Sequence, residues 1–102
     1  MKEIINNKLY NTETATEIAD WRNGPDKGDF RYVEETLYQK KNGEFFLYGF
    51  GGPLSKYGIS WGSRGRCSDS VLIPFSDEET KNWLAEHSFA DTYIDLFGEI
   101  DE

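Results

Sequence analysis

The sequence predicts an α+β fold in which a small antiparallel sheet is packed by one N-terminal and two C-terminal helices. Residues 30–39 alternate between two faces with the period of a strand, and Asn42-Gly43 follows them as the turn of a central hairpin. Ser76 and Glu79 have the spacing of a capping box, which marks the start of a helix. The expected order is strand, strand, helix, strand, strand, loop, strand, helix, helix, and this order belongs to the α+β class.

The first third of the chain is expected to hold a hairpin and then a helix. Residues 3–10 form two strand-like runs around Asn6-Asn7, and asparagine tolerates the positive φ that a tight turn needs. A helix is expected next because four side chains fall on one face at helical spacing, namely Ala15, Ile18, Ala19 and Arg22. Residues 23–25 (Asn-Gly-Pro) should end this helix, since proline cannot continue it.

The rest of the chain is expected to supply the partner strand of the hairpin, a long loop, a buried strand and two helices. Residues 44–48 are the partner strand, and residues 71–75 are the buried strand. Residues 49–70 hold six glycines and five serines, which indicates a Gly-rich, partly ordered loop with one short strand near Tyr57–Trp61. After the helix that begins at the capping box, a second helical piece is expected over residues 91–97.

The negative charge is concentrated in the last third of a chain that is one domain's worth of protein. The 102 residues include 19 acidic and 11 basic side chains, so the formal net charge is −8. Residues 71–102 contain nine carboxylates and one lysine, whereas the rest of the chain holds ten acidic and ten basic side chains. We therefore expect a single acidic domain over residues 1–102. No direct DNA binding is expected, because such binding normally requires a basic face.

Two interpretations of the acidic third remain open. In the first, the carboxylates are the solvated faces of two amphipathic helices and keep the protein soluble. In the second, they form a row that a basic partner surface reads in place of a nucleic-acid backbone, because carboxylates at i and i+4 stand about 6 Å apart. The candidate partner-binding residues are Glu78, Glu79, Glu86, Asp91 and Asp95.

No catalytic or metal-binding arrangement has a signature in the sequence. His87 and Cys67 are the only histidine and cysteine, so a structural zinc site would need ligands from another chain. We expect no cofactor, no metal and no enzymatic activity. An alternative is a small RNA-binding protein or nuclease that acts through the Gly-rich basic loop, with Tyr57, Trp61, Arg64, Arg66 and His87 as its residues.

The sequence predicts a cytoplasmic location and no membrane association. Residues 1–10 contain no apolar stretch of the kind found in signal peptides. The longest uncharged run, residues 45–55, is interrupted by glycines and a proline and is too short to span a bilayer. A single unpaired thiol fits a reducing compartment. The oligomeric state stays open.

The chain resembles small acidic proteins of Gram-positive bacteria and their mobile elements. The resemblance is carried by IINNKLYNTETA at 4–15, GEFFLYG at 43–49 with GGPLSKY at 51–57, IPFS at 73–76 and LFGE at 96–99. Some of these proteins are anti-CRISPR proteins that inhibit the RNA-guided nuclease of type II-A systems. The resemblance thus implies that the partner is this nuclease and that the protein competes there with guide RNA or target DNA. It assigns no role to individual residues, and the chain departs from these proteins at residues 62–70.

Three functions are therefore weighed against one another. The first is an inhibitor that binds the type II-A nuclease through an acidic surface. The second is the RNA-binding protein or nuclease described above, acting on guide RNA. The third is a regulatory protein–protein adaptor whose contact surface is the Gly-rich loop.

Overall fold

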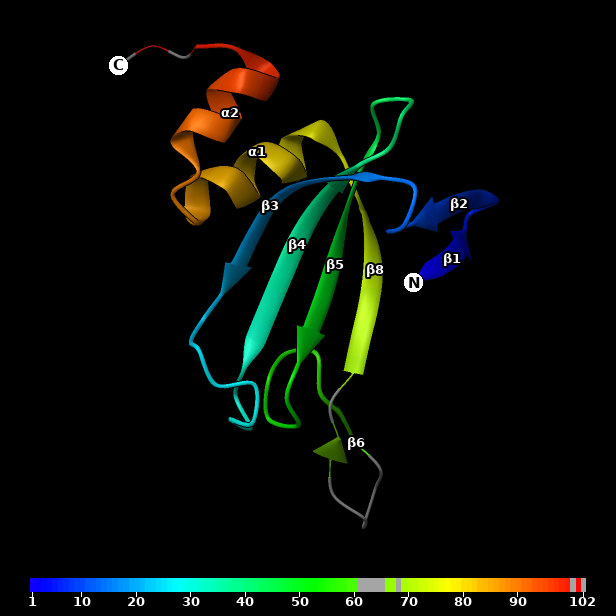
Figure 1. The fold of residues 1–102 in the computed structure, drawn as a ribbon, viewed down its shortest axis with the longest axis vertical. Helices are drawn as coiled ribbons and strands as arrows, with labels where there is room; N and C mark the ends of the chain where they lie inside the picture. Colours follow the sequence, from blue (N-terminus) through cyan, green and yellow to red (C-terminus); the bar gives the residue numbers. More distant parts are fainter. Residues whose placement is uncertain (61–65, 68, 100, 102) are drawn as a thin grey trace.

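A computed structural model describes residues 1–60, 66–67, 69–99 and 101 of the chain. It is an α+β fold with a two-stranded and a four-stranded antiparallel sheet and two helices (Figure 1). The elements are β1 (Lys2–Ile5), β2 (Lys8–Asn11), β3 (Thr16–Arg22), β4 (Val33–Gln39), β5 (Phe45–Gly51), β6 (Ile59–Ser60), β7 (Arg66–Cys67), β8 (Asp69–Phe75), α1 (Asp77–Glu86) and α2 (Ala90–Phe97). Figure 1 shows both helices at one end of the larger sheet and β6 beyond the other end.

The larger sheet has the strand order β3-β4-β5-β8, and each pair of neighbours is antiparallel. Residues 40–44 connect its two central strands. The Gly43 N–H donates to the Lys40 carbonyl at 2.9 Å, and the Lys40 N–H donates to the Glu44 carbonyl at 2.8 Å. Gly43 has a φ of 95°, a conformation that is strained for a residue with a Cβ atom. The turn is therefore a three-residue loop that ends on a left-handed glycine.

The prediction of a helix around Ala15–Arg22 is wrong, because Thr16–Arg22 forms the edge strand β3. It pairs with β4 from Thr16 opposite Gln39 to Arg22 opposite Glu34. The register shifts between Glu17 and Ala19, so that the adjacent Ile18 and Ala19 both pack on the same core as Trp21. A bulge of this kind breaks the period of two and imitates helical spacing. Pairing along a whole strand then outweighs the weak propensity of a short helix.

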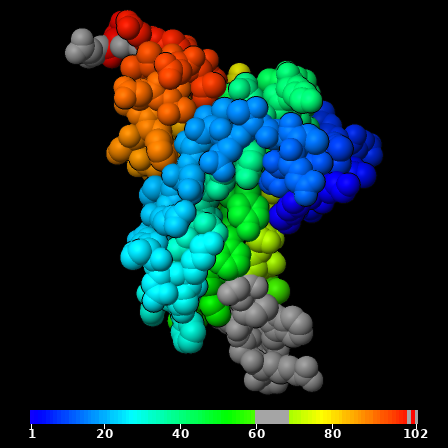
Figure 2. Space-filling model, viewed as in Figure 1, coloured from blue at the N-terminus to red at the C-terminus, as the bar shows by residue number. Residues whose placement is uncertain are grey.

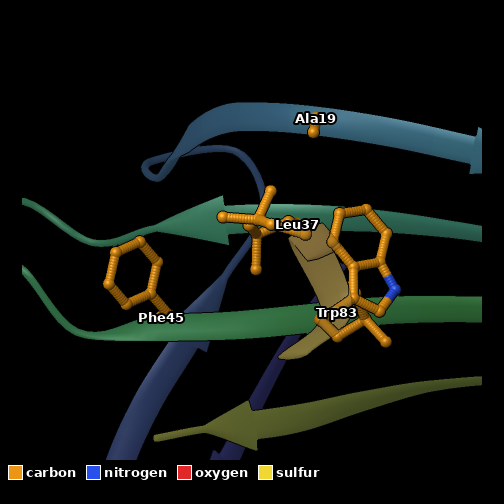
Figure 3. Close-up of a cluster of buried hydrophobic side chains, with 6 residues drawn as sticks. Ala19, Leu37, Phe45 and Trp83 are labelled. Carbon is orange, nitrogen blue, oxygen red and sulfur yellow. The ribbon is translucent and has the colours of Figure 1, made fainter. Parts of the chain in front are cut away.

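The larger sheet buries a cluster of apolar side chains on each face. On one face, helices α1 and α2 cover the first cluster (Figure 3). Its buried members are Ala19, Leu37, Phe45, Leu47, Trp83 and Leu84. On the other face, Phe46 and Leu72 pack with Tyr10 of the β1–β2 hairpin. Successive residues of a strand point to opposite faces, which is why Phe45 and Phe46 belong to different clusters.

The small hairpin β1–β2 is confirmed, with its turn at Asn6 and Asn7. Both asparagines have positive φ, 52° and 64°, as a two-residue hairpin turn requires. In the space-filling view the hairpin is the dark blue region at the right, and lighter blue and green segments separate it from the orange and red helices at the upper left (Figure 2). Its Tyr10 packs on the face of the larger sheet opposite to the one that α1 and α2 cover.

The two C-terminal helices follow β8 directly. The capping box at the start of α1 is confirmed: the Ser76 hydroxyl accepts from the Glu79 N–H at 3.0 Å, and the Ser76 N–H donates to the Glu79 carboxylate at 2.9 Å. Helix α2 ends at Gly98, which has a φ of 88°. Within the part of the chain that the structure describes, no helix is long and apolar enough to cross a membrane.

The Gly-rich stretch is only partly loop. Strand β5 extends to Gly51, and the short strand expected near Tyr57–Trp61 is present as β6, which pairs with β7. Strand β8 already begins at Asp69 and not at residue 71. Trp61 and Arg64 lie outside the described residues.

Candidate functional site

The register of the larger sheet places a carboxylate beside an indole and a glycine on the face that the helices cover. Glu35 of β4 is opposite Trp21 of β3 on one side and opposite Gly49 of β5 on the other. Partners in register point to the same face of a sheet. Trp21, Glu35 and Gly49 therefore form one row across three strands, next to the apolar cluster.

Gly49 leaves the space that the Tyr57 ring occupies. A Cβ atom at residue 49 would overlap the phenol ring. Because the glycine has no side chain, the connection after β5 folds back and lays Tyr57 directly on the strand. This brings the Tyr57 hydroxyl to the carboxylate of Glu35, which the hydroxyl donates to.

Replacing Gly49 by alanine should displace Tyr57 and lower the free energy of unfolding by about 1–3 kcal/mol, because the added methyl group overlaps the ring. Urea unfolding followed by fluorescence measures the change. Gly24→Ala is the matched control, since a Cβ at residue 24 meets nothing within 4 Å and should cost less than about 0.5 kcal/mol. Equal stabilities of the two variants would contradict the packing described.

Glu35 is buried, with 1% of its surface exposed, and it accepts three side-chain hydrogen bonds. Besides Tyr57, the donors are the Trp83 Nε1–H at 2.9 Å and the Lys56 ammonium at 2.7 Å. Trp83 comes from α1, and Lys56 comes from the segment between β5 and β6. The carboxylate thus connects the sheet, the loop and the first helix.

These donors decide the charge of the buried group. Burial by itself raises the pKa of Glu35, but the hydrogen bonds from Lys56, Tyr57 and Trp83 outweigh it and hold the pKa below its ordinary value. Burial and the bond to Glu35 raise the pKa of Tyr57. The pair is therefore an ionised carboxylate and a protonated phenol at neutral pH.

Stability should fall as the solution is acidified below about pH 4.5, the ordinary pKa of glutamate. A carboxylate whose pKa is lowered in the folded state contributes stability above its unfolded pKa, and this contribution is lost as the pH falls through the folded value. The measurement is urea unfolding at pH 7 and pH 3 for the wild type and Glu35→Gln. The difference between them should shrink at pH 3.

Glu44 also has a lowered pKa, so it too contributes to the loss of stability at acid pH, and a second variant separates its contribution from that of Glu35. The hydrogen bond from Lys8 holds the pKa of Glu44 at about 2. The double variant Glu35→Gln/Glu44→Gln should therefore depend less on pH than Glu35→Gln alone. Parallel pH profiles for the wild type and Glu35→Gln would show that Glu35 makes no such contribution.

The imidazole ring of His87 packs between two indole rings next to Glu35. Its ring centroid is 4.2 Å from that of Trp21 and 4.9 Å from that of Trp83. Its Nε2 atom lies 3.6 Å from the Glu35 carboxylate, and 11% of its side chain is exposed. The only histidine is thus a packed residue at the edge of the core, with one nitrogen turned to the carboxylate.

A cavity of about 620 Å³ opens beside this cluster. Its walls include the ring systems of Trp21, Tyr57, Trp83 and His87, together with Glu35 and Lys56. Helix α1 adds one stripe of polar side chains, Glu79, Asn82 and Glu86. Three carboxylates against one ammonium give the lining a formal charge of −2 with a neutral histidine.

The five carboxylates predicted to bind a partner are all exposed on α1 and α2. They are Glu78, Glu79, Glu86, Asp91 and Asp95. Within the described ranges, none of them is paired with a cation within 4 Å. Only Glu79 and Glu86 border the cavity; the other three lie away from it. The structure therefore divides the predicted row into a cavity-lining pair and a set of three outside the cavity.

The residues of the alternative, an RNA-binding protein or nuclease, are brought together only in part. Tyr57 and His87 both face Glu35. Arg66 belongs to the two-residue strand β7. The described residues also hold no group of three or more histidine, cysteine or carboxylate side chains placed to bind a metal ion.

Sequence reasoning missed Glu35, Trp21 and Lys56. One signal could have found Glu35: it stands between Val33 and Leu37 on the same face of a strand, so a carboxylate interrupts an apolar row. A charge in such a place is rare unless it is paired. No comparable signal marks Lys56, whose role depends on how its loop folds back.

No family model matches the chain, and neither a curated protein nor a solved structure does. The family resemblance given above therefore remains a prediction.

Proposed function

We propose that this chain is an inhibitor that binds the RNA-guided nuclease of a type II-A CRISPR system in the cytoplasm of a bacterial host. The observation that supports this most is the exposed carboxylate surface of α1 and α2. Five acidic side chains there have no cation within 4 Å in the described part of the chain, so their charge is available to a partner. In this proposal they compete with guide RNA or target DNA.

Electrostatics gives the proposal its mechanism. Asp91 and Asp95 are one turn apart on α2, which separates them by about 6 Å along the axis, a spacing similar to that of backbone phosphates. The nuclease holds its nucleic acids in strongly positive channels. A compact protein with a net charge of −8 is steered toward such a channel and disfavours contacts with acidic surfaces.

An order-of-addition cleavage assay tests the proposal. Purified type II-A nuclease is mixed with this protein either before or after the guide RNA, and cleavage of a matched target is measured. Inhibition is expected, and stronger inhibition when the protein precedes the guide would assign the competition to guide loading. No inhibition in either order, across several nuclease orthologues, would overturn the proposal.

One observation favours the second candidate, a nuclease or RNA-binding protein: Tyr57 and His87 converge on Glu35. The same assay separates the two, because the guide RNA is recovered afterwards. A guide shortened by the wild type and left intact by His87→Ala would favour the nuclease. An intact guide together with inhibition favours the inhibitor.

A further inference from the structure

The cavity beside Glu35 already holds one cation, which belongs to the chain itself. The Lys56 ammonium lies 2.7 Å from a Glu35 oxygen and 5.2 Å from the centroid of the Tyr57 ring. A carboxylate and an aromatic face are the two groups that bind an organic cation best. The contacts of Lys56 therefore indicate that the cavity suits an organic cation as its ligand.

Two of the three carboxylates that line the cavity are not neutralised by Lys56. Lys56 neutralises Glu35, whereas Glu79 and Glu86 line the same cavity from α1 with no cation within 4 Å in the described ranges. Both are exposed. Trp21, which is partly exposed, adds a second ring. A volume of about 620 Å³ is large enough for more than one side chain.

We propose that this cavity binds the guanidinium group of an arginine side chain on the partner's surface. The guanidinium donates hydrogen bonds to Glu86 and lies against the ring of Trp21, and Glu79, whose carboxylate also accepts from the Ser76 N–H, adds negative charge to the same cavity. Arginine fits better than lysine because its planar group carries five N–H donors in a fork and stacks on aromatic rings, whereas an ammonium is a compact and strongly hydrated charge. The inference rests on the proposed function in that the arginine belongs to the basic surface of that partner.

A titration with blocked arginine (N-acetyl-arginine amide) tests the assignment. Blocked citrulline is the matched control, since it has almost the same shape and no charge. The readout is the pair of indole N–H signals of Trp21 and Trp83 in NMR spectra. We expect saturable shifts with arginine at millimolar concentration and at least about fivefold weaker binding of citrulline. Equal responses to the two, or equal binding of blocked lysine, would overturn the assignment.

Two double variants locate the binding. Glu79→Gln/Glu86→Gln removes both carboxylate charges that α1 adds to the cavity, and glutamine at residue 79 keeps the capping box. It should weaken arginine binding at least about fivefold. Glu3→Gln/Glu13→Gln makes the same change in net charge at the β1–β2 end of the chain and should alter binding less than about twofold. Similar losses in both variants would mean that arginine responds to net charge and not to the cavity.

The outcomes for the cavity and for the proposed function are separable. If the protein inhibits the nuclease but does not prefer arginine to citrulline, this inference fails and the inhibitor proposal stands. If arginine binds as described but the nuclease is not inhibited in either order, the cavity assignment stands and the identity of the partner is wrong.

Discussion

Replacing Glu35 by alanine should lower the free energy of unfolding by about 3–5 kcal/mol. The buried carboxylate accepts hydrogen bonds from Lys56, Tyr57 and Trp83. Without it, the indole N–H and the phenol lose their acceptor inside the protein, and leaving buried donors unpaired costs more than the bonds themselves contribute. The cost also includes the empty volume left by the missing side chain.

Urea unfolding at pH 7 measures this effect, and two controls make it specific. Glu35→Gln keeps an acceptor oxygen for Trp83 and should lose less than the alanine variant. Glu34→Ala removes the neighbouring carboxylate, which points to the opposite face, accepts a hydrogen bond from the Tyr32 hydroxyl at 3.3 Å and lies 3.7 Å from an exposed lysine, Lys27. It should cost less than Glu35→Ala, about 1–2 kcal/mol, because it leaves one long hydrogen bond unmade and not three. A Glu35→Ala protein within 1 kcal/mol of the wild type would contradict the role given to this residue.

Reversing the charge of Glu78, Asp91 and Asp95 to lysine should weaken binding to the guide-free nuclease about 100-fold or more. Each reversal replaces an attraction to the basic channel with a repulsion, and three such changes at about 1 kcal/mol each reach that factor. These three residues lie outside the cavity, so the arginine site keeps its own carboxylates. Titration calorimetry with the purified nuclease gives the dissociation constants.

A matched triple variant distinguishes an effect of where the charges lie from an effect of the net charge alone. Glu3, Glu13 and Glu17 are exposed in the N-terminal part of the sequence, outside α1 and α2, and reversing them also changes the net charge from −8 to −2, since each reversal adds two. This variant should bind less than about tenfold more weakly than the wild type. Thermal unfolding controls for folding, because Glu78 and Asp91 also stabilise the first turns of their helices, each by up to about 1 kcal/mol. Equal losses in the two triples would contradict a contact through α1 and α2.

Local signals in the sequence predicted the parts of the fold that local chemistry determines. The Asn6-Asn7 turn and the Ser76–Glu79 capping box involve residues that are neighbours in the chain, so their patterns are visible without a structure. Strand β3 was missed because its bulge puts Ile18 and Ala19 into one core, and this depends on the partner strand β4. Helical spacing alone could not distinguish the two structures.

The exposed carboxylates were predictable from composition, whereas the buried site was not. Tyr57 is 22 residues from Glu35, and Trp83 is 48 residues away. Their meeting depends on Gly49, which leaves room for the phenol ring, and on the way α1 crosses the sheet. Contacts of this kind follow from tertiary packing, and a single sequence carries no direct record of them.

Hydrogen–deuterium exchange of this protein, free and bound to the guide-free nuclease, tests most directly the claim that α1 and α2 form the contact surface. Binding should slow exchange in Asp77–Glu86 and Ala90–Phe97. The β1–β2 hairpin, which packs on the other face of the larger sheet, should keep its free rates. Protection confined to the hairpin or to the β6–β7 end, with unchanged rates in both helices, would contradict the account.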